Sequence, residues 1–283
     1  MRLIRAELLK ARRRRATWVM LIVMLVIMGL IYLVAGAAFQ LLGVIEFPAA
    51  YALISQFAFG LGGLLALVYA AAFVGADWNW GVVRNVIARG ESRTAYLLAK
   101  AAALAVMFAI ALVLIFLFGI VMTYVTGLIW SVPVVSPLRG RGLQDLADWL
   151  VLTYPVILQR AAIGLVVAVL LRSQLAGAVV GVLLYLGEPI IRFTLTLFTF
   201  GAVLEDRFMN NFEPGPNQWF QFLPITIGDY VVQGAPGAVN LQNSLEGLLI
   251  KPVPVEIGML TVLIYLLVTI AIGIFFFNRQ EIV

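Results

Sequence analysis

The sequence lacks both cysteine and histidine, and only 12% of its 283 residues carry a charge. The first absence excludes disulfides and thiolate nucleophiles, and the second excludes imidazole bases. Together they remove the usual ligands of zinc and haem. The 14 carboxylates are scattered along the chain, so no acidic metal cluster is expected either. The sequence therefore predicts neither a catalytic residue nor a metal site.

The shortage of charge accompanies long apolar runs. Hydrophobic residues make up 63% of the chain, and a soluble domain of this length would carry about 25% charged residues. Several runs reach the roughly 20 residues that a helix needs to cross a bilayer, and none alternates like a barrel strand. We expect an all-α polytopic membrane protein forming a single transmembrane domain, residues 1–283, with six transmembrane helices at about 17–39, 50–76, 94–126, 149–171, 174–200 and 255–277.

A basic segment precedes the first span. Apolar residues recur there at helical spacing, at Met1, Ile4, Leu8 and Ala11, while Arg5 and Arg12 lie off that stripe. This pattern predicts a short interfacial helix. The alternative is a basic cluster that only sets the topology.

Charge is distributed unequally between the two sets of connections. Segments 1–16, 77–100, 171–174 and 278–283 hold thirteen Lys or Arg against four acidic residues, and the opposite connections hold four against nine. Basic residues mark the cytoplasmic side, so we expect a multi-pass protein of the cell membrane with both termini cytoplasmic. Because the basic residues flank spans, they indicate contact with membrane lipid rather than with nucleic acid.

The last outer loop, 201–254, is long and unlike a solvated linker. Six prolines separate moderately apolar pieces that contain Trp219, Phe220 and Tyr230. Aromatic residues between interrupted helix signals favour short re-entrant or interfacial pieces.

Residues 77–93 interrupt the apolar sequence between the second and third spans. Val82, Val83, Val86 and Ile87 share one face of a short helix, and Arg84, Asn85 and Arg89 point elsewhere. Gly90 ends this helix, and Ser92 can cap the next one. The helix either floats at the membrane interface or is presented to a cytoplasmic partner.

The sequence DWNWGVVRNVIARGESRTAYLLAK resembles the signature region of type-2 ABC transporter permeases, the membrane subunits of bacterial ABC exporters. The matching positions are Asp77, Gly81, Arg84, Val86, Ile87, Ser92, Arg93 and Lys100. The likeness covers the whole chain in layout but only about 25 residues as a motif. Asp77 stands where Glu is commoner in the family, and Val82 stands where Thr is commoner.

This resemblance implies a cytoplasmic coupling helix that docks on an ABC-type ATP-binding subunit. The residues expected to make or shape that contact are Asp77, Gly81, Arg84, Asn85, Val86, Ile87, Arg89, Gly90, Ser92 and Arg93. It also implies a dimer with a second permease copy or a similar permease, and ATP and Mg bound by the partner. No cofactor is expected in this chain, which lacks a G-x-x-x-x-G-K-[ST] loop.

Other functions stay open. A non-transporting membrane scaffold or regulator with a permease-like fold, or an ion-gradient-driven transporter, would share the six spans. An intramembrane enzyme is disfavoured because no nucleophile and base are paired in the sequence. The sequence does not identify the substrate.

Three charged residues fall inside predicted spans. A charge at the bilayer centre costs at least about 2.5–3.5 kcal/mol, so Arg160, Glu188 and Arg192 should face protein or water. Glu188 and Arg192 lie four residues apart, which permits an ion pair. Arg160 and Glu188 lie ~18 and ~21 Å from the turn between their spans at the helical rise, so the three can meet. This intramembrane polar network either fixes helix packing or lines a transport path.

Overall fold

The computed structural model describes residues 2–41, 46–131, 134, 136–137, 141–209, 219–234 and 253–280, and the described chain is helical without a strand. Within these described residues, six helical stretches are long and apolar enough to cross a membrane. This confirms the predicted number of spans. The bounds of the helices are α1 Arg2–Arg13, α2 Arg15–Leu41, α3 Ala49–Phe59, α4 Leu61–Asn79, α5 Val82–Ala88, α6 Arg93–Ile129, α7 Gly142–Leu171, α8 Gln174–Met209, η1 Trp219–Phe222, α9 Pro224–Gln233 and α11 Val255–Arg279.

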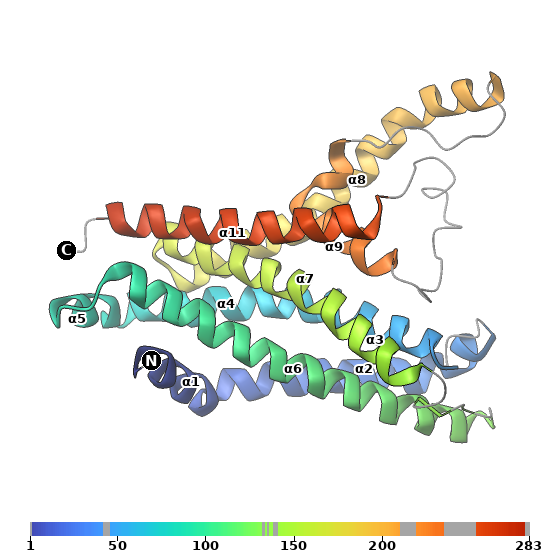
Figure 1. The fold of residues 1–283 in the computed structure, drawn as a ribbon, viewed down its shortest axis with the longest axis horizontal. Helices are drawn as coiled ribbons and strands as arrows, with labels where there is room; N and C mark the ends of the chain where they lie inside the picture. The colour runs from blue at the N-terminus through green and yellow to red at the C-terminus, as the bar shows by residue number, and fades with distance from the viewer. Residues whose placement is uncertain are drawn as a thin grey trace.

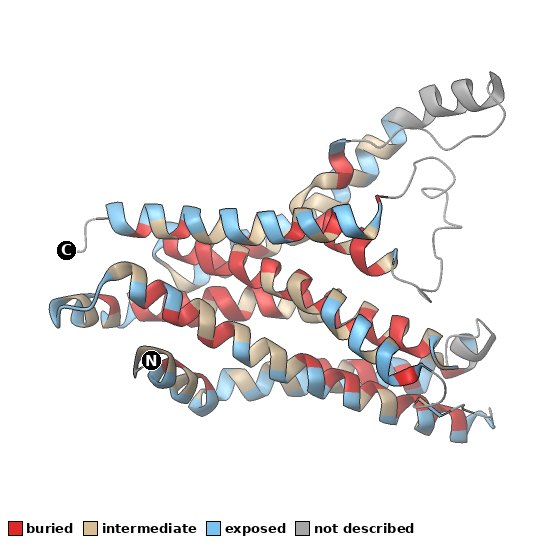
Figure 2. Ribbon diagram, in the orientation of Figure 1, coloured by how far each residue is buried: buried red, intermediate tan, exposed pale blue. Residues whose placement is uncertain are grey.

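The long helices run side by side, with α4 and α7 at the centre of the bundle (Figures 1 and 2). In the α3–α4 and α7 spans, 56% and 61% of the most apolar window is buried, against 11% in α8 and 17% in α11. All of these helices are strongly apolar, so burial and not hydropathy separates the central helices from the peripheral ones. The outer faces of α2, α8 and α11 are left for lipid or for another chain.

The first described helix, α1, and the C-terminal end of the last one, α11, lie at the same end of the bundle. Figure 1 shows α1, α5 and the C-terminal end of α11 together there, which we call the terminal end. The α7–α8 turn also packs there, because a Cβ atom on Gly75 of α4 would lie 2.5 Å from the Gln174 Cα atom. The described parts of the four segments that carry most of the basic charge therefore share one end.

The second span differs from its predicted form. The single helix expected at 50–76 is broken at Gly60, whose φ and ψ are −68° and −90°, into α3 and α4. A break inside a span frees backbone carbonyls that lipid cannot satisfy, so other groups of the protein must bind them.

Two other boundaries were wrong by more than a helical turn. Helix α7 begins at Gly142 instead of 149, and α8 continues past 200 to Met209, into the segment predicted as the outer loop 201–254. The rest of that loop contains η1 and α9, while 210–218 and 235–252 lie outside the described residues. Most of α9 is buried, including Ile227 and Val231, and it packs against α11, α7 and α8. Of the aromatic residues named for this segment, Phe220 and Tyr230 are therefore packed inside the protein, whereas Trp219 is exposed.

Candidate functional site

Helix α5 is a separate short element at the terminal end. Gly81 and Gly90 bound it with φ angles of 65° and 88°, a left-handed conformation that glycine adopts without steric cost. Val83 is buried, and Val86 and Ile87 pack against the hydrophobic core. The helix is therefore seated on the bundle by its apolar side.

The two faces of α5 are divided as the sequence predicts, but the apolar face points inward. Arg84, Asn85 and Arg89 are exposed. Val86 and Ile87, which were expected to contact a partner, instead contact the chain's own core. A partner that binds α5 in this conformation would meet a basic and polar surface.

Asp77, the first residue of the predicted coupling segment, is fully buried. Its carboxylate accepts hydrogen bonds from the Lys10 ammonium and the Tyr96 hydroxyl, and it lies 2.6 Å from the Lys100 Nζ atom. Lys100 is fully buried as well, with its Nζ atom 4.5 Å from the centroid of the Phe73 ring. Asp77 is therefore the centre of an internal ion cluster and not part of an exposed surface.

Helix α1 supplies part of this ion cluster. Glu7 Oε2 accepts a 3.0 Å hydrogen bond from Lys100 Nζ, and Lys10 Nζ lies 3.9 Å from the same oxygen. The stripe that predicted an interfacial helix is half-buried at Leu8 and buried at Ala11, and α1 packs against α6. The helix exists as predicted, but its polar residues Glu7 and Lys10 join α4 and α6, a role that the sequence analysis missed.

The other end of the coupling segment is fixed to the last span. Ser92 caps α6, as predicted, by accepting a 3.1 Å hydrogen bond from the Ala95 N–H. The guanidinium of Arg93 donates to the carbonyls of Phe277, Asn278 and Gln280 at the C-terminal end of α11. These carbonyls have no partner within their helix and carry its negative dipole end, so a cation binds them favourably. Segment 77–93 is thus attached through its two ends to α1, α4, α6 and α11.

A second polar group lies deeper in the bundle, around Arg160 of α7. The Arg160 side chain is fully buried and donates to the Phe59 carbonyl at the end of α3, and its Nη2 atom lies 2.5 Å from Asp229 Oδ1. The Tyr185 hydroxyl donates to the Gly60 carbonyl at 2.6 Å. The guanidinium fits beside α4 only because Gly63 lacks a side chain, since a Cβ atom there would lie 2.6 Å from Nη1. Arg160 and Tyr185 therefore bind the carbonyls of Phe59 and Gly60 at the break in the second span.

Glu188 and Arg192 do not form the ion pair that their spacing allowed. Glu188 Oε1 accepts 2.6 Å hydrogen bonds from the N–H groups of Ile225 and Thr226 in the first turn of α9. Arg192 Nη1 instead lies 3.8 Å from Asp229 Oδ2. The Glu188 carboxylate thus binds the N-terminal, positive end of the α9 dipole. Asp229 forms ion pairs with both Arg160 and Arg192.

Asp229 was missed because it lies in the segment predicted as outer loop. Four residues before it, Ile225 lies in the first turn of α9, so one short helix presents both the N–H groups for Glu188 and the carboxylate for Arg160. The pairing required knowing that α9 enters the bundle between spans. The sequence did hold one hint, because two arginines and one glutamate within predicted spans leave one cation without a counter-ion.

Replacing Glu188 with alanine should lower the free energy of unfolding by about 1–3 kcal/mol, because two buried N–H groups lose their acceptor. Glu188→Gln keeps a side-chain oxygen and should cost less. Thermal unfolding in nanodiscs measures both. Unchanged unfolding in Glu188→Ala would contradict the role of Glu188 as the acceptor of these two N–H groups.

Among the described residues, no group of three or more Asp or Glu side chains could hold a metal ion. Comparisons of the chain with protein-family models and with curated proteins find no match. The geometry offers two features: a basic helix α5 fixed to several spans at the terminal end, and a buried polar group that joins α3, α7, α8 and α9.

Proposed function

We propose that the chain is the membrane-spanning permease subunit of an ATP-driven ABC exporter. It would couple ATP binding and hydrolysis in a separate subunit to movement of a substrate across the cell membrane. The main observation in support is how α5 is attached. Its basic face is exposed, while the residues before and after it are fixed to the spans through Asp77 and Arg93. A helix attached in this way suits the transmission of force from a partner to the bundle.

Charge supports an acidic docking surface on that partner. Arg84 and Arg89 are exposed on α5, and exposed charges steer association with a surface of opposite sign. The resemblance of residues 77–100 to the type-2 permease signature indicates that this partner is an ATP-binding subunit. The chain lacks the phosphate-binding loop that would let it use ATP by itself.

The proposed complex has two permeases. Helices α2, α8 and α11 expose most of their apolar side chains, so a second copy or a similar permease has a large apolar surface on which to pack. Both termini and α5 would then face the cytoplasm, where ATP and Mg are bound by the partner.

Arg84→Glu should abolish stimulation of the partner's ATPase activity while leaving the unfolding temperature of the chain unchanged, because Arg84 contacts solvent. Arg93→Glu should differ from Arg84→Glu in its effect on stability. It should destabilise the chain by about 1.5–3 kcal/mol, since it removes charge-assisted hydrogen bonds to the α11 carbonyls. Thermal unfolding and ATPase assays of the complex purified in mild detergent separate these two effects.

Normal association and normal ATPase stimulation in Arg84→Glu would reject the docking role of α5. A chain that purifies alone, with no ATP-binding subunit, would favour a membrane scaffold or regulator with this fold.

An ion-gradient-driven transporter is the second candidate, and the Arg160–Asp229–Arg192 group favours it. Such a transporter binds its coupling ion at polar residues near the middle of the membrane. Transport that continues without ATP but stops when the ion gradient is collapsed would select this candidate. Transport that requires ATP and survives collapse of the gradient would select the exporter.

A further inference from the structure

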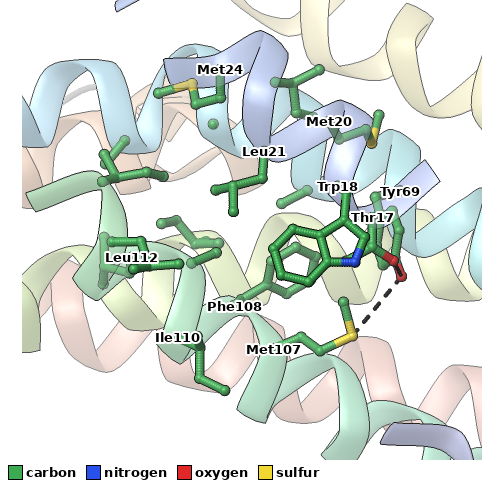
Figure 3. A pocket seen from close by; sticks show the side chains of 18 of the residues that line it. Thr17, Trp18, Met20, Leu21, Met24, Tyr69, Met107, Phe108, Ile110 and Leu112 are labelled. Atoms are coloured by element: carbon green, nitrogen blue, oxygen red, sulfur yellow. Dashed lines mark hydrogen bonds between the residues drawn. The ribbon is translucent and has the colours of Figure 1, made fainter. Parts of the chain in front are cut away.

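An apolar cavity of about 490 Å³ lies between α2 and α6, with α4 behind it. Figure 3 shows side chains from these helices pointing into one space. An apolar cavity of roughly 150 Å³ already holds a benzene-sized ligand, so this one has room for a much longer hydrocarbon. Its lining includes Met20, Met24, Leu65, Met107, Ala111 and Ile115.

The hydroxyl groups that line the cavity, those of Thr17 and Tyr69, are already hydrogen-bonded. The Thr17 hydroxyl lies 2.7 Å from the Tyr69 hydroxyl and donates to the Ala11 carbonyl at 2.6 Å. Met20, Met24 and Met107 adapt to irregular apolar shapes because the thioether chain is flexible and polarizable. The interior therefore suits a hydrocarbon chain and offers no free polar group for a sugar, an ion or a peptide backbone.

The cavity opens toward the outer surface of the bundle. Trp18 of α2 and Val106, Ile110 and Leu114 of α6 line it and are also exposed. These residues lie within helices apolar enough to cross a membrane. The opening consequently faces the hydrocarbon of the bilayer, from which an acyl chain can enter.

Positive charge stands at the α1 end of the cavity. Arg12 lines it and is exposed, with Arg13 and Arg15 exposed beside it. The Trp18 indole N–H donates to the Arg12 carbonyl at 2.9 Å, which fixes the backbone of Arg12 over the start of α2. A guanidinium above an apolar cavity complements a molecule with an anionic head and a hydrocarbon tail.

We propose that this cavity binds one acyl chain of an anionic membrane phospholipid, whose phosphate is held by Arg12. The lipid wedges between α2 and α6 and supports the junction of α1 and α2. This site depends on the membrane location of the chain and not on an ATP-binding partner. Its failure would leave the proposed transport function untouched.

Trp18 gives a direct optical test. The chain is reconstituted in nanodiscs of phosphatidylcholine that contain a small fraction of one brominated lipid. This lipid is either phosphatidylglycerol or phosphatidylcholine, and its brominated acyl chains quench nearby tryptophan fluorescence. The Trp18 signal is the difference between the chain and its Trp18→Phe variant. Brominated phosphatidylglycerol should compete for the Trp18 position about fivefold better than brominated phosphatidylcholine, the ratio that one surface basic residue provides.

Two matched pairs of variants locate the site. Arg12→Gln should lose the preference for phosphatidylglycerol, whereas Arg13→Gln, one position along and not lining the cavity, should keep most of it. Ala111→Phe places a ring in the cavity and should reduce quenching by both lipids, whereas Val113→Phe changes an exposed residue of the same helix outside the cavity. If Ala111→Phe fails to fold, Gly62→Leu fills the cavity from the opposite wall.

Equal competition by the two brominated lipids would overturn the assignment of an anionic lipid. Quenching of Trp18 that is unchanged in a folded Ala111→Phe or Gly62→Leu variant would overturn the cavity as the binding site.

Discussion

Replacing Arg160 with methionine should lower the free energy of unfolding by about 3–5 kcal/mol, because it leaves the Asp229 carboxylate without its closest cation. The same substitution removes the donor from the Phe59 carbonyl at the break between α3 and α4. A buried carbonyl without a partner adds to the loss. Thermal and denaturant-induced unfolding in nanodiscs measure the change.

The double variant Arg160→Met with Asp229→Asn is the control for this prediction. Removing both charges should restore part of the stability, since neither is then buried alone. Arg192→Met should cost less than Arg160→Met, because Arg192 is partly exposed and its contact with Asp229 is longer, at 3.8 Å. Equal losses in Arg160→Met and Arg192→Met, or additive losses in the double variant, would contradict the pairing of Arg160 with Asp229.

Asp77→Asn should also destabilise the chain by about 3–5 kcal/mol and loosen α1 from α6. The substitution keeps the shape of the side chain but leaves Lys10 and Lys100 to share Glu7. Two ammonium groups in one buried site repel each other, and the one on α1 is the easier to release to water.

Limited trypsin digestion detects that release, because Arg12, Arg13 and Arg15 follow the anchoring residues and are exposed. Cleavage near the α1–α2 junction should become several times faster in Asp77→Asn, as the locally opened state becomes more populated. Asp148→Asn is the matched control, since Asp148 is exposed at the start of α7. Unchanged cleavage and unchanged unfolding in Asp77→Asn would refute the role of the ion cluster in holding α1.

The spans were predictable because one quantity, the length of an apolar run, decides where they lie. A helix that crosses a bilayer needs about 20 apolar residues, and the run from Val255 to Phe277 meets that requirement without help from tertiary contacts. The cap of α6 at Ser92 was predictable for a similar reason. Both depend on neighbouring residues alone.

The break at Gly60 and the ion pair with Asp229 depend on residues far apart in the sequence. Arg160 compensates the break from 101 residues away in α7, and Asp229 lies 69 residues from Arg160. The expected pairing of Glu188 with Arg192 used their spacing on one helix, and the entry of α9 supplied both with other partners. Local periodicity carries no information about such insertions.

The orientation of α5 shows the same limit. The sequence separates Val83, Val86 and Ile87 from Arg84 and Arg89, and the structure does so too. Which face meets the bundle depends on what lies beside the helix. Helix α4 packs against α5, and Val83, Val86 and Ile87 contact the core of the bundle, so the arginines are left outside.

The most direct test of the central claim is to cross-link α5 to its neighbour in native membranes. Because the chain has no cysteine, Asn85→Cys provides one attachment site on the exposed face for a photoreactive benzophenone, and Asp148→Cys provides a matched exposed site on α7. The account predicts an adduct from position 85 with an ATP-binding subunit, identified by mass, and none with that subunit from position 148. The same adduct from both positions, or no ATP-binding subunit among the products of position 85, would contradict a coupling role for α5.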